Sequence, residues 1–408
     1  MTLDPTDPAP VDPTDPVALA AALVRAPSVT PNAGPALDAL ERALAPLGFA
    51  VTRTVDGAEG TPDVPNLHAI LPGDGPLGSP HLAFAGHLDV VPPGEGWSRD
   101  PFSGEIADGF LHGRGSVDMK SGVAAFVAAV ARRLERGPIP GTVSLVVTGD
   151  EEGPAIAGTR ALLDWMIARD LVPDACVVGE PTSGEVFGDR IKVGRRGSLT
   201  GVLTVRGVQG HAAYPERADN PVRGMAVLLD ALLREPFDGG TERFQATNLE
   251  VTTVDVGNPA ANVIPGRATA TFNVRHNDRW TADTLRREVE QRLAGAANAP
   301  TPLRAAEGPI KWSVAWREPP SECFLTSDRR LIEAASGAVE RVTGRRPELS
   351  TGGGTSDARF IKSHCPVIEL GIVGRTMHEV DERASIGDIE ALARVYEALI
   401  DGWMDAER

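Results

Sequence analysis

The spacing of apolar residues along the first 180 positions changes between the period of a helix and that of a strand. Leu37, Leu40, Leu44 and Leu47 recur every three or four residues, which predicts one face of a helix that ends at Gly48. Short continuous apolar runs are typical of buried strands. The expected helices span 17–26, 121–136 and 159–169, and the expected strands span 49–55, 66–71, 82–86, 142–148 and 175–178.

The pattern changes near residue 197. Residues 267–275 alternate between apolar and polar positions, which predicts a strand with one buried face. From 199 to 316 the order is strand, helix, strand, strand, helix, strand, which is the split βαβ, ferredoxin-like arrangement. The expected strands span 199–206, 247–256, 267–275 and 311–316, and the expected helices span 221–233 and 281–293.

After this segment the alternation of helices and strands resumes, with helices expected at 328–342 and 388–404 and a strand at 367–370. A chain of 408 residues is too long for one ordinary core, so two domains are expected. Alternating strands and helices favour an α/β layer that binds ligands at the carboxyl ends of its strands. The sequence therefore predicts an α/β domain interrupted by a smaller α+β domain. A disordered tail is expected at 1–16, the two parts of the α/β domain at 17–197 and 310–408, and the inserted domain at 198–309.

Composition and charge limit the classes of function. The chain has 56 acidic residues against 40 Lys and Arg, a formal net charge of −16, which repels nucleic acid and anionic membranes. No apolar run reaches the ~18–20 residues that a membrane-spanning helix needs. Cys176, Cys323 and Cys365 are too few and too scattered for a disulfide framework. We therefore expect a cytoplasmic protein that binds neither nucleic acid nor membrane.

Acidic and imidazole side chains follow several of the expected strands. Two imidazoles with three or four carboxylates suit a divalent ion, with zinc the first choice and manganese or cobalt the alternatives. Five ligands exceed what one four-coordinate ion with an open position requires, whereas two ions about 3.5–4 Å apart that share a carboxylate would use them all. Each acid taken alone is more often a solvated surface group, so the hypothesis depends on the conjunction at strand ends. The set comprises His87, Asp89, Asp118, Glu151, Glu152, Glu180 and His378.

These motifs resemble the co-catalytic zinc site of the M20 family of aminoacylases, carboxypeptidases and deacylases. The resemblance rests on His87-Leu88-Asp89, Asp118 in its Gly-Arg-Gly setting, Glu151-Glu152, Gly179-Glu180-Pro181-Thr182 and His378. It covers residues 17–402 and implies an α/β/α zinc-hydrolase catalytic domain, interrupted by a ferredoxin-like α+β lid that mediates dimerisation. Within the family, the chain looks most like the branch that acts on N-succinyl-LL-2,6-diaminopimelate, through its motifs at 27–31, 194–198, 210–215, 262–265 and 352–360.

The resemblance implies two bound Zn²⁺ ions, with Co²⁺ or Mn²⁺ as alternatives at one position. Asp118 would bridge the two ions. His87 and Glu180 would complete the coordination of one ion, and Glu152 and His378 that of the other.

The resemblance also implies the catalytic roles. Asp89 would orient the metal-binding histidine, and Glu151 would be the general base that takes a proton from water and passes it to the leaving amine. His211, on the insertion, would reach the active site of a partner subunit and stabilise the oxyanion, which implies a homodimer through residues 198–309. The alternative for His211 is an ordinary turn residue.

The same resemblance implies a group of residues that binds the carboxylates of a small anionic acyl-amino-acid substrate. Guanidinium groups make bidentate contacts with carboxylates, and in a chain with a net charge of −16 a local positive patch favours a dianionic acyl group such as succinyl. The alternatives are a solvated Arg275 at a strand end and a Tyr214 that packs beside Pro215. The implied contacts are Arg195, Ser198, Tyr214, Asn262, Arg275 and Thr355.

The implied reaction is hydrolysis of N-succinyl-LL-2,6-diaminopimelate to succinate and LL-2,6-diaminopimelate, in lysine and diaminopimelate biosynthesis. The first alternative is a sister deacylase such as acetylornithine deacetylase, an aminoacylase or a carboxypeptidase. The second is a non-catalytic metal- or ligand-binding homologue, against which the presence of Glu151 and Asp118 argues. The sequence departs from the pattern of the branch at Ala261, Gly374, Glu379 and Asp381. These positions concern substrate binding and leave the metal ligands intact.

Overall fold

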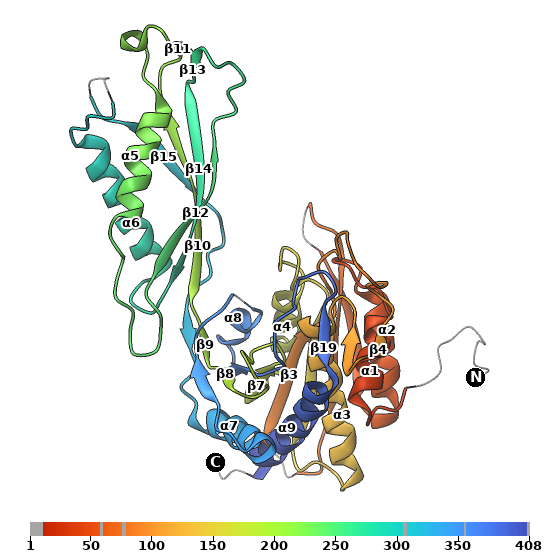
Figure 1. The fold of residues 1–408 in the computed structure, drawn as a ribbon. Coiled ribbons are helices and arrows are strands. Elements are labelled where there is room, and N and C mark those ends of the chain that lie inside the picture. Colours follow the sequence, from red (N-terminus) through yellow and green to blue (C-terminus); the bar gives the residue numbers. More distant parts are fainter. Residues whose placement is uncertain (1–10, 58–59, 76–78, 305–307, 355, 406–408) are drawn as a thin grey trace. The chain divides into compact units, whose positions relative to one another are not determined.

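The computed structural model describes residues 11–57, 60–75, 79–304, 308–354 and 356–405, which form two compact units (Figure 1). Each unit has its own buried apolar cluster, as expected of two independently packed domains. The first unit comprises Met1–Val193, Thr326–Ser350 and Ser356–Arg408, and the second comprises Gly194–Leu325 and Thr351–Thr355.

The boundaries of these units differ from the expected ones. Residues 310–325 belong to the second unit, because β15 (Lys311–Trp316) pairs with β10 (Gly197–Arg206) along its whole length. The end expected at residue 309 therefore moves to Leu325. Residues 1–10 of the expected tail lie outside the described residues. The expected tail ends at residue 16, and α1 begins there, with Pro16.

The first unit is built around a mixed eight-stranded sheet in the order β1-β2-β6-β3-β7-β18-β8-β17. Its neighbours β6, β3, β7 and β18 run parallel, so their carboxyl ends lie along one edge. A separate three-stranded sheet has the order β19-β5-β4. The strands are β1 (Ala50–Asp56), β2 (Val64–Leu71), β3 (His81–His87), β4 (Glu105–Ala107), β5 (Phe110–His112), β6 (Thr142–Thr148), β7 (Ala175–Val178), β8 (Arg190–Lys192), β17 (Glu348–Ser350), β18 (Val367–Glu369) and β19 (Arg383–Ser385).

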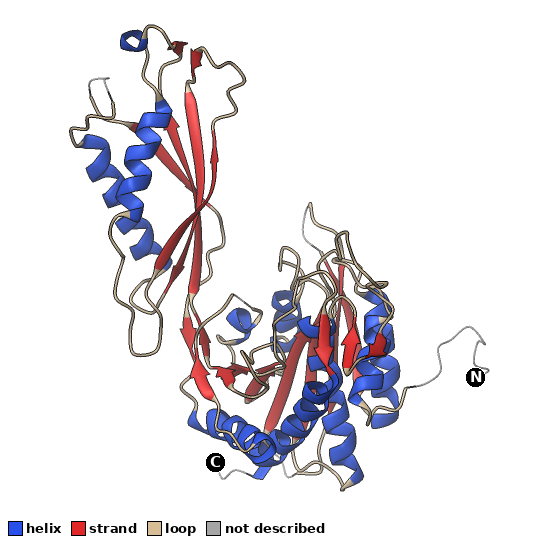
Figure 2. Cartoon of the chain, viewed as in Figure 1, coloured by secondary structure: helices blue, strands red, loops and turns tan. Residues whose placement is uncertain are grey.

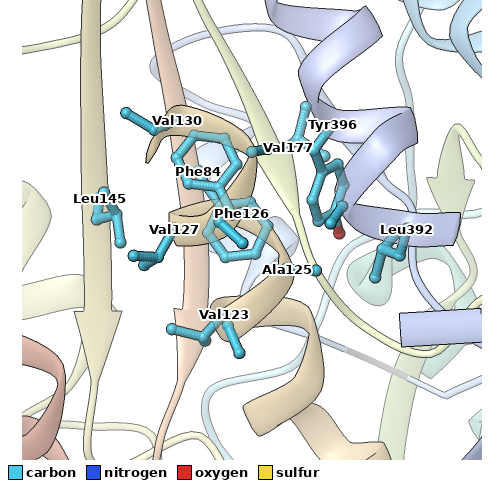
Figure 3. Close-up of a cluster of buried hydrophobic side chains, with 14 of the residues drawn as sticks. Phe84, Val123, Ala125, Phe126, Val127, Val130, Leu145, Val177, Leu392 and Tyr396 are labelled. Atoms are coloured by element: carbon cyan, nitrogen blue, oxygen red, sulfur yellow. The ribbon is translucent and has the colours of Figure 1, made fainter. Parts of the chain in front are cut away.

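Helices α3 and α9 share one face of this sheet. Phe84 of β3, Phe126 of α3 and Tyr396 of α9 are fully buried and pack ring against ring, with centroids 4.4 to 5.9 Å apart (Figure 3). Burying an aromatic side chain of this size contributes roughly 1.5–3 kcal/mol. The helices of the first unit are α1 (Pro16–Val24), α2 (Gly34–Leu44), α3 (Ser121–Glu135), α4 (Thr159–Ile167), α7 (Arg329–Thr343), α8 (Ala358–Ile361) and α9 (Ile386–Asp405), with short helical turns η1 (Ala45–Leu47) and η2 (Ser116–Lys120).

The second unit is an antiparallel sheet in the order β12-β14-β10-β15, with α5 and α6 on one face (Figure 2). Alternate residues of β14 are buried in the cluster beneath these helices, as the alternation in the sequence predicts. Two short ribbons extend the unit, β11 with β13 and β9 with β16. Its elements are β9 (Gly194–Arg195), β10, β11 (Gly210–His211), η3 (Pro215–Arg217), α5 (Pro221–Leu233), β12 (Asn248–Asp255), β13 (Val263–Ile264), β14 (Arg267–His276), α6 (Ala282–Asn298), β15 and β16 (Phe324–Leu325).

This architecture confirms the expected fold class, an α/β unit interrupted by a smaller antiparallel unit with two helices. The elements that the sequence did not predict are mostly strands of two or three residues, which are too short to produce a periodic pattern. Across the described ranges, no helix combines the length and the apolar character required to cross a membrane.

Candidate metal centre

The parallel strands of the first unit bring three groups of polar residues to one edge. His87 is the last residue of β3, and it lies level with Thr148, the last residue of β6. Glu151 and Glu152 follow β6 within a few residues, and Glu180 follows the next parallel strand, β7. Carboxyl ends of parallel strands are where open α/β sheets bind ligands, so this edge is the candidate site.

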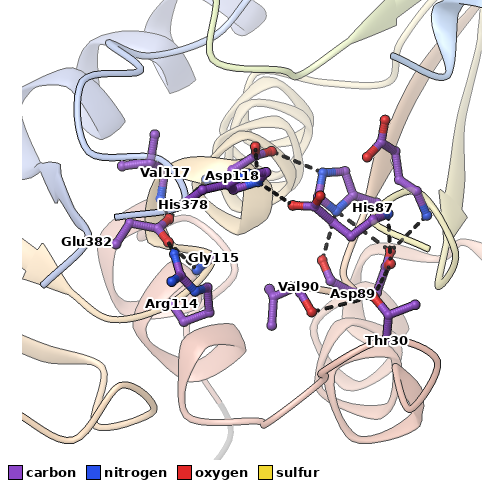
Figure 4. Close-up of polar contacts among 12 residues, drawn as sticks. Thr30, His87, Asp89, Val90, Arg114, Gly115, Val117, Asp118, His378 and Glu382 are labelled. Carbon is purple, nitrogen blue, oxygen red and sulfur yellow. Dashed lines mark hydrogen bonds and ion pairs between the residues drawn. The ribbon is translucent and has the colours of Figure 1, made fainter. Parts of the chain in front are cut away.

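Two connecting segments add Asp118 and His378. Asp118 lies in η2, before α3, and His378 lies between β18 and β19. Nε2 of His87 is 3.1 Å from Oδ1 of Asp118, and Nε2 of His378 is 3.3 Å from Oδ2 of the same carboxylate (Figure 4). Each oxygen of one carboxylate therefore faces a different imidazole, which is the arrangement that a carboxylate shared by two cations requires.

The other two proposed ligands each lie beside one of these histidines. Oε1 of Glu152 is 2.8 Å from Nε2 of His378, and Oε1 of Glu180 is 3.9 Å from Nε2 of His87. Imidazoles and carboxylates in this mixture suit zinc and similar divalent ions. Two triplets in the described part of the chain have ligand atoms within 4.8 Å of one another, namely His87, Asp118 and Glu152, and His87, Glu151 and Glu180. The donor set fits two cations, because it exceeds the four ligands of one tetrahedral ion.

Asp89 lies beside the histidine and also contacts the loop of the two glutamates. Nδ1 of His87 lies 2.8 Å from the main-chain carbonyl of Asp89 and 3.7 Å from its carboxylate, so the ring N–H donates to the carbonyl and Nε2 stays available for a cation. The carboxylate instead accepts the main-chain N–H groups of Glu151 and Glu152, at 3.2 and 3.0 Å, and the hydroxyl of Thr30 at 2.7 Å (Figure 4). Asp89 therefore positions both the histidine and the two glutamates.

The mutual proximity of these groups shifts their pKa values. Burial opposes the charged form of His87, but the hydrogen bond with Asp118 and the surrounding negative charges raise its pKa well above 6.5. Hydrogen bonds with Asp118 and Glu152 raise the pKa of His378 to about 10. Burial raises the pKa of Glu151 to about 8. Cations among these side chains would favour unprotonated histidines and ionised carboxylates, as metal binding does at such sites.

A buried amide that the sequence analysis did not identify holds the loop of the two glutamates. Asn66 of β2 is fully buried, and its side-chain carbonyl accepts the hydroxyl of Thr148 at 2.9 Å and the N–H of Gly149 at 3.3 Å. Its amide donates to the carbonyl of Ala157 at 2.8 Å. Asn66 therefore ties both ends of the loop to the sheet. A single asparagine in a strand carries no sequence signal for these contacts, since Thr148, Gly149 and Ala157 lie more than 80 residues away.

In the second unit, three arginines gather at the start of β10. The guanidinium of Arg195 donates to the carbonyl of Gly354 at 2.6 Å, and Nε of Arg196 is buried with no hydrogen-bond partner among the described residues. Ser198 pairs in register with Arg275. Burial and the charges of Arg196 and Arg195 lower the pKa of Arg275. Within the described ranges, Arg196 and Arg275 form no ion pair with an acidic side chain, so an anionic ligand would complete this cluster. Arg196 is an addition to the residues singled out from the sequence.

His211, Tyr214 and Asn262 lie at the other end of the second unit. Nδ1 of His211 accepts the N–H of Ala213 at 3.1 Å, so the ring proton is on Nε2, and the side chain is exposed. Tyr214 is 52% exposed, and the carbonyl of Asn262 accepts the N–H of Ala212 at 2.9 Å. The expected substrate residues therefore form two groups and not one.

The length of β10 separates these two groups. Figure 1 shows β9 at one end of β10 and β14, and β11 with β13 at the other. Ser198 and Arg206 are eight residues apart on β10, which at a rise of about 3.3 Å corresponds to about 26 Å. Thr355, the last of the expected substrate residues, lies outside the described residues.

Comparison with known proteins identifies the family. The sequence model of peptidase family M20/M25/M40 matches residues 83–402, which is more than half of the chain. The chain belongs to this family. The two-unit architecture is that of M20 metal-dependent hydrolases, with a catalytic unit and an inserted lid.

Solved structures share the fold over nearly the whole chain. Human carnosine dipeptidase 1 is 20% identical, with a TM-score of 0.71 and coverage of 97% of both chains. A tripeptidase from Staphylococcus aureus is 18% identical, with a TM-score of 0.76 and coverage of 98% of this chain and 100% of the other. A dinuclear metal-binding M20 peptidase from Bacillus subtilis is 18% identical, with a TM-score of 0.68 and coverage of 96% and 97%. At these identities the likeness concerns the fold.

Proposed function

We propose that this M20 hydrolase is a dizinc amidohydrolase that cleaves N-succinyl-LL-2,6-diaminopimelate to succinate and LL-2,6-diaminopimelate, a step of lysine and diaminopimelate biosynthesis. Family membership supports the reaction type. The observation that carries the proposal is the carboxylate of Asp118, whose two oxygens face His87 and His378 beside the half-buried Glu151.

The proposed ligands divide into two sites. Site 1 consists of His87, Asp118 and Glu180, and site 2 consists of Asp118, Glu152 and His378. When bound there, two zinc ions would lower the pKa of a water molecule and polarise the scissile carbonyl, and cobalt or manganese would suit the same donors. Asp118 would hold both ions, because each of its oxygens lies beside one of the two histidines.

Glu151 is the residue that we assign to proton transfer. Its main-chain N–H is held by Asp89, and its carboxyl lies in a group with His87 and Glu180. Burial raises its pKa to about 8 in the protein alone, and neighbouring cations would bring this value down. A carboxylate tuned toward neutral pH can accept a proton from water at Oε and return it to the departing amine. No side chain has to act as the nucleophile.

The arginine cluster supports an acyl group that carries a free carboxylate. Arg196 and Arg275 carry positive charge without an acidic partner in the described ranges, and Arg195 lies beside them. A succinyl group keeps a free carboxylate after amide formation, and guanidinium groups bind carboxylates through paired N–H donors. An acetyl group offers no such charge. The cluster therefore favours a succinylated substrate over an acetylated one.

The separation within the second unit supports a homodimer. The arginines and the His211 group lie at opposite ends of β10, whose residues Ser198 and Arg206 are about 26 Å apart, so one copy of the unit cannot present both to one small substrate. A second copy would supply the missing group. We propose that Nε2–H of His211 from the partner donates to the carbonyl oxygen as negative charge develops on it. Tyr214 and Asn262, which lie next to the same short ribbon, would contact the substrate from that side.

A substrate panel tests this proposal. The protein is loaded with zinc, its zinc content is measured, and kcat/KM is determined for succinyl-diaminopimelate, acetylornithine, an N-acyl amino acid, a dipeptide and a tripeptide. The Glu151→Gln variant, prepared in parallel, measures hydrolysis by contaminating enzymes. We expect succinyl-diaminopimelate to have the highest kcat/KM.

The other outcomes distinguish the alternatives. Faster hydrolysis of acetylornithine or of a peptide would replace the proposed substrate and retain the metal-dependent mechanism. If protein that holds two zinc ions hydrolyses none of the amides, the chain is a non-catalytic homologue. A lower kcat/KM in a forced monomer would support the contribution of the partner subunit. So would activity that appears when His211→Ala and Glu151→Gln protomers, each impaired alone, are mixed.

A further inference from the structure

Glu382 is a fully buried carboxylate that no step of the proposed reaction uses. It lies four residues after His378, directly before β19. Its side chain reaches the turn that contains Asp118 (Figure 4). Oε1 accepts the N–H of Val117 at 2.8 Å and that of Asp118 at 3.3 Å, and Oε2 accepts the N–H of Gly115 at 3.1 Å. One carboxylate therefore accepts three main-chain N–H groups of a segment more than 260 residues away.

The guanidinium of Arg114 completes this cluster. Its Nη1 donates to Oε2 of Glu382 at 2.7 Å, and the two side chains are 3% and 0% exposed. Its Nη2 donates to the carbonyl of Pro93 at 3.2 Å, and the ring of Trp97 covers the guanidinium at 5.2 Å. The N–H of Gly113 also donates to the main-chain carbonyl of Glu382, at 2.9 Å. Residues 113–118 are thus held by the side chain and the main chain of one residue.

The turn depends on these contacts because its own backbone provides few. Asp118 has φ −122° and ψ 98°, which lies outside the helical region, and Gly115 has φ +82°. The N–H groups in such a turn lack the acceptors of a regular helix and need others, since a buried unpaired N–H is costly. Glu382 supplies the acceptors. The carboxylate of Asp118 is therefore oriented through its own main chain.

The segment that contains both His378 and Glu382 is also constrained. His378 and Asp381 adopt φ values of 61° and 59°, which residues other than glycine rarely adopt and which persist only where surrounding contacts fix them. The hydroxyl of Thr376 donates to the carbonyl of Arg383 at 3.0 Å and accepts the N–H of Arg383 at 3.1 Å. These two hydrogen bonds close the segment into a loop next to Glu382. The loop and the Asp118 turn meet at the buried carboxylate.

We propose that Glu382 is a positioning residue that sets the distance between Asp118 and His378 and thereby the cation affinity of site 2. This inference rests on the two-cation site of the proposed function and is independent of the substrate. Glu382 connects two of the three ligands of site 2. The ligands that complete site 1, His87 and Glu180, come from the ends of β3 and β7, which Glu382 does not contact. The loss of Glu382 therefore weakens one site more than the other.

The matched pair of variants is Glu382→Gln and Asp238→Asn. Glutamine preserves the size of the side chain but replaces one accepting oxygen with a donor that faces other donors. Asp238, in the second unit, is also a carboxylate that accepts several N–H groups, from Gly240 at 2.8 Å, Thr247 at 3.2 Å and the indole of Trp280 at 2.8 Å. Asp238→Asn therefore controls for the general loss of a hydrogen-bonded carboxylate.

The experiment measures cation binding to the full chain. Protein stripped with a chelator is titrated with Zn²⁺ by calorimetry, and the absorption spectrum of the Co²⁺-substituted protein is recorded after each equivalent. His87→Ala and His378→Ala assign the two binding steps to site 1 and site 2. We expect Glu382→Gln to weaken the site 2 step by roughly 10- to 100-fold, as changes to residues that support metal ligands do, with a smaller change at site 1 and none in Asp238→Asn.

Each other outcome has a definite meaning. If Glu382→Gln binds both ions as the unmodified protein does, or weakens both sites equally, the positioning role is refuted and the proposed function stands. If the unmodified protein binds fewer than two ions, the two-cation site itself is refuted. If Glu382→Gln does not fold, Arg114→Gln serves instead, because it leaves the carboxylate and removes its cationic partner. Unchanged site 2 affinity in that variant would also refute the role.

Discussion

Replacing Gly371 by alanine tests how tightly the fold fixes the ligand Glu180. Gly371 follows β18, and a Cβ atom at this position would lie 2.3 Å from the carbonyl oxygen of Glu180 and 2.8 Å from its carbonyl carbon. Real Cβ atoms essentially never approach closer than 3.0 Å, so the two segments must separate by at least about 0.7 Å, the difference between 2.3 and 3.0 Å. Both obstacles are backbone atoms, so no side-chain rotation relieves the contact.

Gly371 cannot move away at low cost. Its N–H donates to the hydroxyl of Thr182 at 3.0 Å, and its carbonyl accepts the hydroxyl of Ser183 at 2.8 Å, so a shift of its backbone would strain both hydrogen bonds. Overpacking of this kind costs about 1–3 kcal/mol, which lowers the melting temperature by roughly 2–4 °C per kcal/mol in a domain of this size. A displacement approaching 1 Å at a reacting site costs up to roughly 100-fold in rate.

The assay compares Gly371→Ala with Gly337→Ala in α7, where the new Cβ would meet no described atom within 4 Å apart from its chain neighbours and the backbone of its own helix. We expect Gly371→Ala to lower the melting temperature, the zinc affinity of site 1 and kcat/KM together. Gly337→Ala should leave binding and rate unchanged and raise stability by about 0.5–1 kcal/mol. If Gly371→Ala matches the unmodified protein in melting temperature and site 1 affinity, the spacing of Glu180 is not fixed by this contact.

Three further predictions concern the base, the substrate and pH. Glu151→Gln should retain two zinc ions by metal analysis and lose roughly 10²- to 10⁴-fold in kcat, and an active variant would remove Glu151 from the role of base. Arg275→Gln should raise KM for succinyl-diaminopimelate by roughly 10- to 100-fold, because it removes one charge-assisted hydrogen bond to the substrate carboxylate. Its zinc affinity should be unchanged, and an unaltered KM would exclude this contact. Burial lowers the pKa of His68 from 6.5 to about 4, so the folded protein binds fewer protons than the unfolded chain between these values. The free energy of unfolding should therefore fall by up to about 3 kcal/mol as pH drops from 6.5 to 4, and urea unfolding of His68→Gln should lack this part of the slope.

The sequence predicts the fold where periodic patterns are long. The strand at 142–148 and the helix at 221–233 have the bounds of β6 and α5, because each is a continuous apolar or amphipathic segment between turn residues. The end of the insertion is different. The strand at 311–316 is recognisable from its own residues, but only its pairing with β10 assigns it to the second unit, and pairing is not encoded in a local pattern.

The candidate site divides in the same way. His87 and Glu180 could be placed together from the sequence, since parallel strands end at one edge of a sheet. The hydrogen bonds of the Asp89 carboxylate could not be predicted from the sequence. The strand β3 ends at His87, and the carboxylate two residues later accepts N–H groups from the loop after β6. Asn66 and Glu382 have partners 82 to 268 residues away, and buried polar groups with distant partners leave no mark on their neighbours in sequence.

The central claim is that Asp118 holds two cations between His87 and His378. Anomalous diffraction at the zinc absorption edge, from crystals of the zinc-loaded protein, tests it most directly. We expect two peaks about 3.5–4 Å apart, one on each side of the Asp118 carboxylate. A single peak, or two peaks that Asp118 does not join, would contradict it.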